Sequence, residues 1–130
     1  MKTLEEIRKV FSKDRFATEN GAVIDSVTDD TAVCSLTLCE RHMNANGAVM
    51  GGVHYMLADF AFAVAVNHDS MSVVSLDASV SFVSAVKGTR LIAMAMCIRS
   101  GFRTVFYRVD VKDDLDNLCA VINITGYRTV

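Results

Sequence analysis

The chain of 130 residues has 52% hydrophobic side chains, 22% charged side chains and a formal net charge of −2. This length predicts one domain over residues 1–130, and the small negative charge without any Lys/Arg block argues against nucleic acid as a partner. No run reaches the roughly 18 apolar residues of a membrane span, and MKTLEEIRKVF lacks the pattern of a secretory signal, so we expect a cytoplasmic protein without membrane contact.

The first third of the chain predicts a short helix and a β-hairpin. Apolar residues at helical spacing favour an amphipathic helix over residues 2–13: Leu4, Ile7, Val10 and Phe11. From residue 21 to residue 38 the pattern changes to β-branched alternation, with Asp29-Asp30 at its turn. This pattern is typical of two paired strands.

The longest predicted element is a helix over residues 51–66, with the sequence GGVHYMLADFAFAVAV. It follows a loop rich in Gly and Asn, and Asp59 is its only carboxylate. Both faces of the helix are apolar, which predicts that other elements surround it. At 1.5 Å per residue it is roughly 24 Å long, a length that suits packing along one sheet.

Four further strands are predicted after this helix. Residues 74–82 alternate strictly, so Val74 and Phe82 share an apolar face and Ser75 lies on the opposite face of a half-buried strand. The other strands cover residues 91–98, 104–111 and 118–127, and we expect the last four to form a meander. The absence of proline suits a continuous antiparallel sheet, and the order of elements is that of the α+β class.

Cysteine and histidine give no sign of a metal site. No pair of cysteines has the two-residue gap of a zinc knuckle, and we expect all four to be reduced core residues: Cys34, Cys39, Cys97 and Cys119. His42 and His54 lack the acidic neighbours that a metal site needs, so no metal is predicted. For His54, a hydrogen-bonded core histidine is the favoured interpretation.

The segment RHMNANGAVMGGVHYMLAD resembles the signature of the phenylacetate-degradation-type (PaaI-like) acyl-CoA thioesterases. That signature runs His-x-Asn, Gly, Gly-Gly and Leu-Ala-Asp, and the spacing matches it without a gap at Asn44, Gly47, Gly51-Gly52 and Asp59. SLDASVSF and SGFRTVFYRVDV are similar to the family's following strands, so the resemblance covers essentially the whole chain. It implies the hotdog fold, an antiparallel sheet of about six strands wrapped round a long central helix.

Two positions depart from the family pattern. Met50 stands where the family often has a histidine, which counts against a mechanism that needs an imidazole there. DDLDN replaces an Asp-Gly turn before the last strand, a change that concerns folding more than chemistry.

The resemblance implies hydrolysis of an acyl-CoA or aryl-acyl-CoA thioester, with Asp59 as the nucleophile or as the general base for water. The residues alone indicate that a carboxylate within an apolar helix needs a raised pKa or a partner from elsewhere. The alternative is an aspartate that reaches solvent at a subunit edge or accepts backbone hydrogen bonds.

Three further groups are candidates for the chemistry. Gly51 and Gly52 open the helix, where free N–H groups and the helix dipole can stabilise an oxyanion, although a glycine pair also lets another backbone pass. Asn44 can donate to the thioester carbonyl or hold the attacking water, or it can simply form a turn. Ser75 matches a position where relatives use a hydroxyl to orient the water, but strand serines often face solvent.

Substrate binding has candidates of two kinds. Coenzyme A is part of the substrate, so no separate cofactor is expected. Its phosphates need basic residues, and the candidates at strand ends or turns are Arg99, Arg103 and Lys87. An arginine at such a place can also simply be solvated. The acyl pocket has apolar candidates in Phe60, Phe62, Phe82 and Met50.

The family's site lies between two subunits, with the Asp from one chain and the Gly-Gly and Asn region from the other. We therefore expect a homodimer or homotetramer. Two other functions remain open: a non-catalytic hotdog module that binds acyl-CoA, and a hydratase or dehydratase on the same fold. The latter would need a histidine with an acidic partner, whereas the four glutamates all lie outside the central helix.

Overall fold

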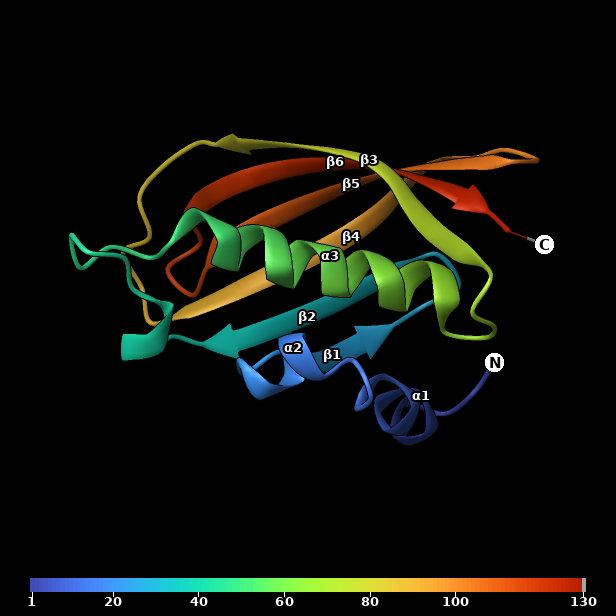
Figure 1. The fold of residues 1–130 in the computed structure, drawn as a ribbon, viewed down its shortest axis with the longest axis horizontal. Helices are drawn as coiled ribbons and strands as arrows, with labels where there is room; N and C mark the ends of the chain where they lie inside the picture. Colours follow the sequence, from blue (N-terminus) through green and yellow to red (C-terminus); the bar gives the residue numbers. More distant parts are fainter. Residues whose placement is uncertain (130) are drawn as a thin grey trace.

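In the computed structural model, which describes residues 1–129, a six-stranded antiparallel sheet curves round one long helix (Figure 1). The α+β class and the long helix are therefore confirmed. In chain order the elements are α1 (Leu4–Phe11), α2 (Arg15–Glu19), β1 (Val23–Val27), β2 (Thr31–Thr37), η1 (Glu40–His42), α3 (Gly51–Asn67), β3 (Val73–Phe82), β4 (Arg90–Ser100), β5 (Thr104–Asp113) and β6 (Leu118–Arg128).

The helix α1 is shorter than the predicted range because side chains fix its start. Thr3 is the N-cap, and its hydroxyl and the Glu6 carboxylate form a capping box. The apolar face buries Ile7, and Arg8 donates two hydrogen bonds, at 3.0 and 2.8 Å, to the carbonyl oxygen of Ile24 on β1. The helix α2, a single short turn with no side-chain cap, was not predicted.

The strand order is β1-β2-β4-β5-β6-β3. The hairpin of β1 and β2 and the meander of β4, β5 and β6 are confirmed. The prediction that β3 belongs to that meander is wrong, because β3 pairs with β6 at the edge farthest from β1. The helix α3 crosses the sheet and delivers the chain to that edge, and residues 83–89 return it to β4 (Figure 1).

A β-bulge interrupts β3 and corrects the predicted strict alternation. Ser75 pairs with Gly126 and Asp77 pairs with Thr125, so Leu76 is an extra residue on this strand. As a result both Ser75, before the bulge, and Phe82, after it, contact α3. Most of β3 is exposed rather than half-buried, because an edge strand has a neighbour on one side only.

The helix α3 covers the sheet with one side and leaves the other side open. Its sheet-facing residues are fully buried, among them Leu57, Ala61 and Val64. The opposite side carries a stripe of residues that the rest of residues 1–129 leaves exposed or half-exposed: Gly52, Tyr55, Met56, Asp59, Ala63 and Val66. The prediction that α3 is surrounded on all sides is therefore wrong for a single copy of the chain.

The cysteines are all free, and they differ in burial. Cys34 and Cys119 are buried, as predicted. Cys97 is half-buried and Cys39 is exposed, because Cys39 lies beyond the end of β2 rather than within the sheet. Apolar sequence neighbours were therefore not enough to place these two side chains in the core.

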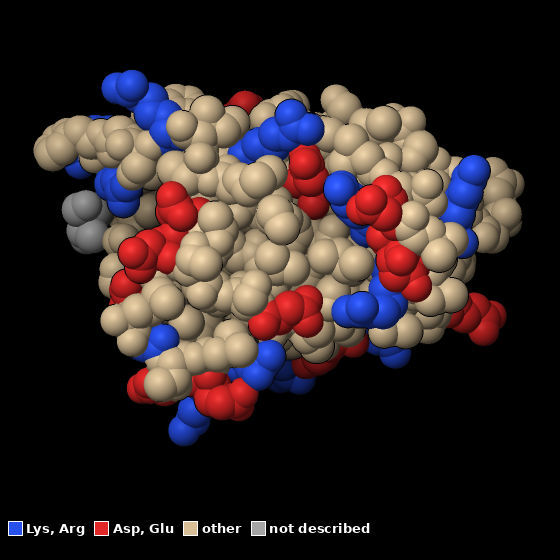
Figure 2. Space-filling view, turned by 180° about the vertical axis from the view of Figure 1, so that it is seen from behind, with Lys and Arg blue, Asp and Glu red and all other residues tan. Residues whose placement is uncertain are grey.

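The face of the molecule seen from behind carries both signs of charge without a continuous patch of either (Figure 2). On β5, Arg108 and Asp110 form an ion pair at 2.8 Å. No helix within residues 1–129 has the length and apolar character to cross a bilayer. Nor does this part of the chain bring three or more His, Cys, Asp or Glu side chains together as metal ligands.

Candidate active site

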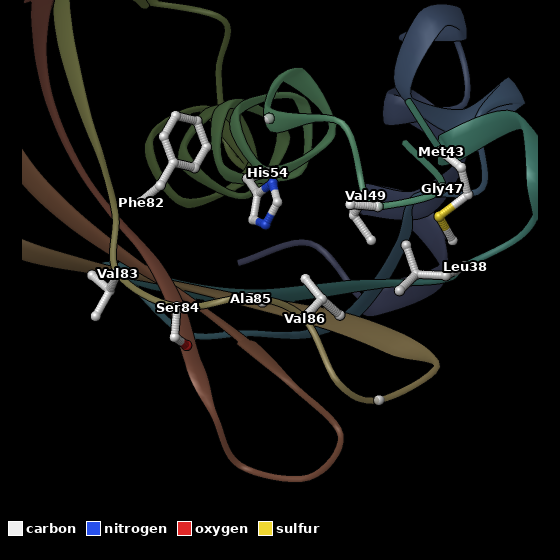
Figure 3. Close-up of a pocket in the computed structure, with 13 residues that line it drawn as sticks. Leu38, Met43, Gly47, Val49, His54, Phe82, Val83, Ser84, Ala85 and Val86 are labelled. Atoms are coloured by element: carbon white, nitrogen blue, oxygen red, sulfur yellow. The ribbon is translucent and has the colours of Figure 1, made fainter. Parts of the chain in front are cut away.

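A cleft of about 560 Å³ lies at the N-terminal end of α3 (Figure 3). The loop before α3, the end of β3 and residues 83–88 form its walls, and most of its lining side chains are apolar. Of the predicted pocket residues, Phe82 lines this cleft. Phe60 and Phe62 instead lie in the core, and Met50 is 53% exposed at the start of α3.

The first turn of α3 presents free backbone donors. Met50 is the N-cap, but no described side chain caps the helix, and the N–H groups of Gly51 and Gly52 make no hydrogen bond within residues 1–129. A Cβ at Gly51 would lie 2.8 Å from the ring of Phe82, so that ring covers Gly51. Gly52 is exposed and would meet only the terminal methyl of Met50. Gly52 therefore offers the more accessible N–H group.

Asn44 organises the loop before α3. Its Oδ1 accepts hydrogen bonds from the backbone N–H groups of Asn46 at 2.9 Å and Ala48 at 3.1 Å. Gly47, with φ at +76°, completes the turn in a conformation that favours glycine. Asn44 thus has the turn-forming role, while its side-chain NH₂ group makes no hydrogen bond to the described residues and is free to donate.

Asp59 and Ser75 form a pair at the middle of α3. The Ser75 hydroxyl donates a long hydrogen bond of 3.4 Å to Oδ1 of Asp59. Burial raises the pKa of Asp59, and the negative charge of Asp14 raises it further, whereas the hydrogen bond from Ser75 lowers it. With no cation among these influences, the net effect is a pKa above the ordinary value for aspartate, as argued from the sequence for a carboxylate without a partner.

Within one chain the predicted site residues fall into two groups. Asn44, Gly51 and Gly52 lie at the start of α3, whereas Asp59 lies seven residues beyond Gly52, about 10 Å along the helix, and does not line the cleft. Both Gly52 and Asp59 nevertheless belong to the open stripe of α3. A single thioester carbon cannot contact both within one copy.

The three basic candidates also separate. Lys87 lies between two residues that line the cleft, Val86 and Gly88. Arg99 and Arg103 lie at the other end of the sheet, near the end of β4 and in the turn before β5. There the Arg103 guanidinium lies 5.3 Å from the ring centroid of Phe102.

A carboxylate that the sequence analysis did not single out fixes one wall of the cleft. Asp113 is 1% exposed and accepts hydrogen bonds from the N–H groups of Lys87 at 2.9 Å and Gly88 at 3.1 Å, besides three from Leu115 and Asn117. Burial would raise the pKa of Asp113, but these hydrogen bonds hold it well below its ordinary value. Because its partners in the wall lie 25 or more residues away in the sequence, local pattern could not reveal them.

Replacing Asp113 by Asn should lower the free energy of unfolding at pH 7 by about 1–3 kcal/mol, because buried donors lose their acceptor. Since the folded pKa is depressed, the stabilisation is present above the unfolded value near pH 4 and is lost as the pH falls below it. Urea unfolding at several pH values checks both points. Asp116→Asn is the control, since Asp116 is exposed and has a φ of 66° that asparagine accepts. Equal stability of the two variants would contradict this role.

His54 corrects one further prediction. It is buried, as expected for a core histidine, but Nδ1 has no hydrogen-bond partner in the described chain, so it is not a hydrogen-bonded core residue. It lines the cleft one turn beyond Gly51.

Comparison with known proteins shows which family the sequence matches. Residues 46–120 match the family model for the thioesterase superfamily. The chain is 24% identical to the acyl-coenzyme A thioesterase PaaI of Escherichia coli over 128 residues, which cover 98% of this chain and 91% of that protein.

Two solved structures show the same fold. A thioesterase from Haemophilus influenzae superposes with a TM-score of 0.88 at 22% identity, covering 100% of this chain and 94% of the other. A variant of the phenylacetic acid degradation protein PaaI from Thermus thermophilus superposes with a TM-score of 0.81 at 28% identity, covering 87% and 97%. The sheet wrapped round α3 is thus the hotdog arrangement. The chain belongs to the thioesterase superfamily.

Proposed function

We propose that this protein hydrolyses an acyl-CoA thioester to a free acid and coenzyme A, at a site shared by two copies of the chain. The family match and the name of the Escherichia coli relative support thioester hydrolysis. The observation that carries the proposal is the open stripe of α3, which combines a free helix N-terminus at Gly52 with a carboxylate of raised pKa at Asp59.

Two copies related by a two-fold axis explain why these groups lie apart. In such a pair the residues of one copy meet different residues of the other, and each contact occurs twice. Antiparallel α3 helices packed through their open stripes bring Gly52 of each copy opposite Asp59 of the other. The arrangement also buries the apolar residues of the stripe, which a single copy leaves partly exposed.

The chemistry divides between these two groups. Asp59 attacks the carbonyl carbon or takes a proton from the attacking water. The N–H group of Gly52 donates to the oxygen on which negative charge develops. The C–S bond then breaks, and the thiolate of coenzyme A leaves and takes up a proton. Where Asp59 is the nucleophile, water next hydrolyses the anhydride between the acyl group and its carboxylate, which releases the free acid and restores Asp59. None of these steps calls for a cofactor.

Lys87, at the rim of the cleft, is the basic residue best placed for the phosphates of coenzyme A within the same chain. Arg99 and Arg103 can serve only if they belong to the partner copy, because they lie at the opposite end of the sheet.

Hydrolysis of a panel of acyl-CoAs, followed through release of the free thiol, tests the proposal. The expected result is turnover of at least one thioester without an added metal or cofactor. Tight binding of acyl-CoA without thiol release would favour the non-catalytic binding module instead. Light scattering at the assay concentration tests the shared site, and an active monomer would contradict it.

Ser75→Ala should move the acidic limb of the pH profile of kcat/KM to higher pH. The hydroxyl stabilises the ionised form of Asp59, so its loss raises the pKa of that carboxyl further and a higher pH is needed to ionise it. Rates measured from pH 4 to pH 9 check the shift. Ser79→Ala, on an exposed position of the same strand, is the control. An unchanged profile in the Ser75 variant would show that the hydroxyl does not influence Asp59.

A further inference from the structure

His54 differs from the other histidines in its hydrogen bonding. His42 uses both ring nitrogens: Nδ1 accepts from the N–H group of Cys39 at 3.0 Å, and Nε2 lies 2.7 Å from the carbonyl oxygen of Asn20. Nε2 of His68 lies 3.0 Å from the carbonyl oxygen of Asp29. His54 is 5% exposed, and its buried Nδ1 has no hydrogen-bond partner within residues 1–129, which is also true of Nδ1 of His68. His54 differs from His68 in that its Nε2 also makes no hydrogen bond to these residues. The carbonyl groups of Met50 and Gly51 raise the pKa of His54, although neither meets the geometry of a hydrogen bond with its Nδ1.

A buried ring nitrogen without a partner destabilises a fold. Leucine would fill the same place without this cost. A ligand in the cleft that hydrogen-bonds to Nε2 would offset this cost, and pockets typically combine apolar walls with a few such polar groups.

The surroundings of the ring show which kind of ligand group fits. The imidazole extends from α3 toward residues 83–86 (Figure 3). It packs against the Phe82 ring in a T-shaped arrangement, with centroids 5.5 Å apart and planes at 83°. The residues lining the cleft include no Lys or Arg. Burial lowers the pKa of His54, so the ring is neutral near pH 7 and offers one N–H donor and one acceptor. An uncharged polar group suits this place, whereas a second carboxylate would lack a counter-charge.

We propose that His54 is a specificity-determining residue that hydrogen-bonds an uncharged hydroxyl or keto oxygen on the acyl group of the substrate. The inference rests on the proposed function. The phosphates of coenzyme A stay in water because their burial is costly, so the free acyl end is the part that enters an apolar cleft. With the thioester oxygen at the N–H group of Gly52, His54 lies two residues further on, roughly 3 Å along the axis, and its side chain extends into the cleft. The favoured substrates are therefore short or aryl acyl-CoAs with a polar oxygen two or three carbons from the carbonyl.

Matched substrates test the proposal. The test compares kcat/KM for butyryl-CoA with that for 3-hydroxybutyryl-CoA, and kcat/KM for benzoyl-CoA with that for 3-hydroxybenzoyl-CoA, in the wild type, His54→Leu and His54→Gln. The wild type should prefer one hydroxylated member by at least about tenfold, since an unmade hydrogen bond to a buried group is costly. His54→Leu should lose this preference through the hydroxylated substrate alone, while His54→Gln, which keeps a donor and an acceptor, should retain part of it.

Folding and binding measurements separate the possible failures. Thermal unfolding of His54→Leu should occur at or above the wild-type temperature, because the histidine makes no hydrogen bond to lose. Analogues of the same substrate pairs, in which a thioether replaces the thioester, cannot be hydrolysed. Their titration by calorimetry therefore measures recognition alone. Equal binding of both members by the wild type, or a preference that survives His54→Leu, would overturn the role of His54. A tenfold binding preference without any thioester hydrolysis would support His54 and overturn the proposed function.

Discussion

Asp59→Asn should reduce kcat for acyl-CoA hydrolysis at least about 100-fold, because the amide can neither attack the carbonyl nor accept a proton from water. KM should change little, since Asp59 does not line the cleft that we propose for the acyl group. Steady-state rates with the best substrate of the panel check the expected kcat and KM. A folded variant that keeps wild-type kcat would remove Asp59 from the mechanism.

The same variant should remain folded at pH 7. A carboxyl whose pKa is raised by folding binds its proton more tightly in the folded state, so its contribution to stability is present at low pH and lost as the pH rises through the folded value. Asn avoids that loss, and the unfolding temperature should be equal or higher. Asp77→Asn, on an exposed position of β3, is the matched control for activity.

Gly52→Pro should lower kcat about 100- to 1,000-fold, the effect typical of removing one oxyanion donor. Proline is tolerated in the first turn of a helix and deletes only the N–H group there. Gly52→Ala, which keeps the N–H group and would contact only the Met50 methyl, should retain most of the activity. Circular dichroism verifies the helix in both variants. Comparable losses for Ala and Pro would point to crowding at Gly52 rather than to a missing donor.

Co-expression of Asp59→Asn with Gly52→Pro then tests whether the site is shared. In a mixed pair one site has both defects and the other has none, so random pairing should restore about a quarter of wild-type activity. Separately expressed variants, mixed without exchange of subunits, should stay inactive. Failure of co-expression to restore activity, with mixed pairs shown by differential tagging, would place the whole site in one copy.

The elements of the fold were largely predictable, because periodicity reports burial. The pattern over residues 51–66 corresponds to α3, and the strands after it begin and end within a few residues of their predicted bounds. The place of β3 was not predictable in the same way. Strands next to each other in the sequence are usually neighbours in the sheet, but here the chain returns across the fold before β4 begins.

The sequence suggested residues for the candidate site, and their roles stay predictions, but it did not reveal their arrangement. The bulge at Leu76 leaves the alternation of the sequence intact, so only the pairing with β6 reveals that Ser75 faces Asp59. The antiparallel meander, by contrast, already places the two ends of β4 far apart. Lys87 precedes one end and Arg99 lies near the other, so the distance between these two residues could have been predicted. The missing hydrogen-bond partner of His54 was not predicted, because a buried histidine usually has partners and their absence is visible only in three dimensions.

The strand β3 carries both Ser75, which contacts Asp59, and Phe82, which covers Gly51, yet within residues 1–129 it is paired only to β6 along one edge. Edge elements of this kind detach at a lower free energy than the central strands. The proposed activity should therefore disappear on mild denaturation while most backbone amides of β4 and β5 still resist hydrogen exchange.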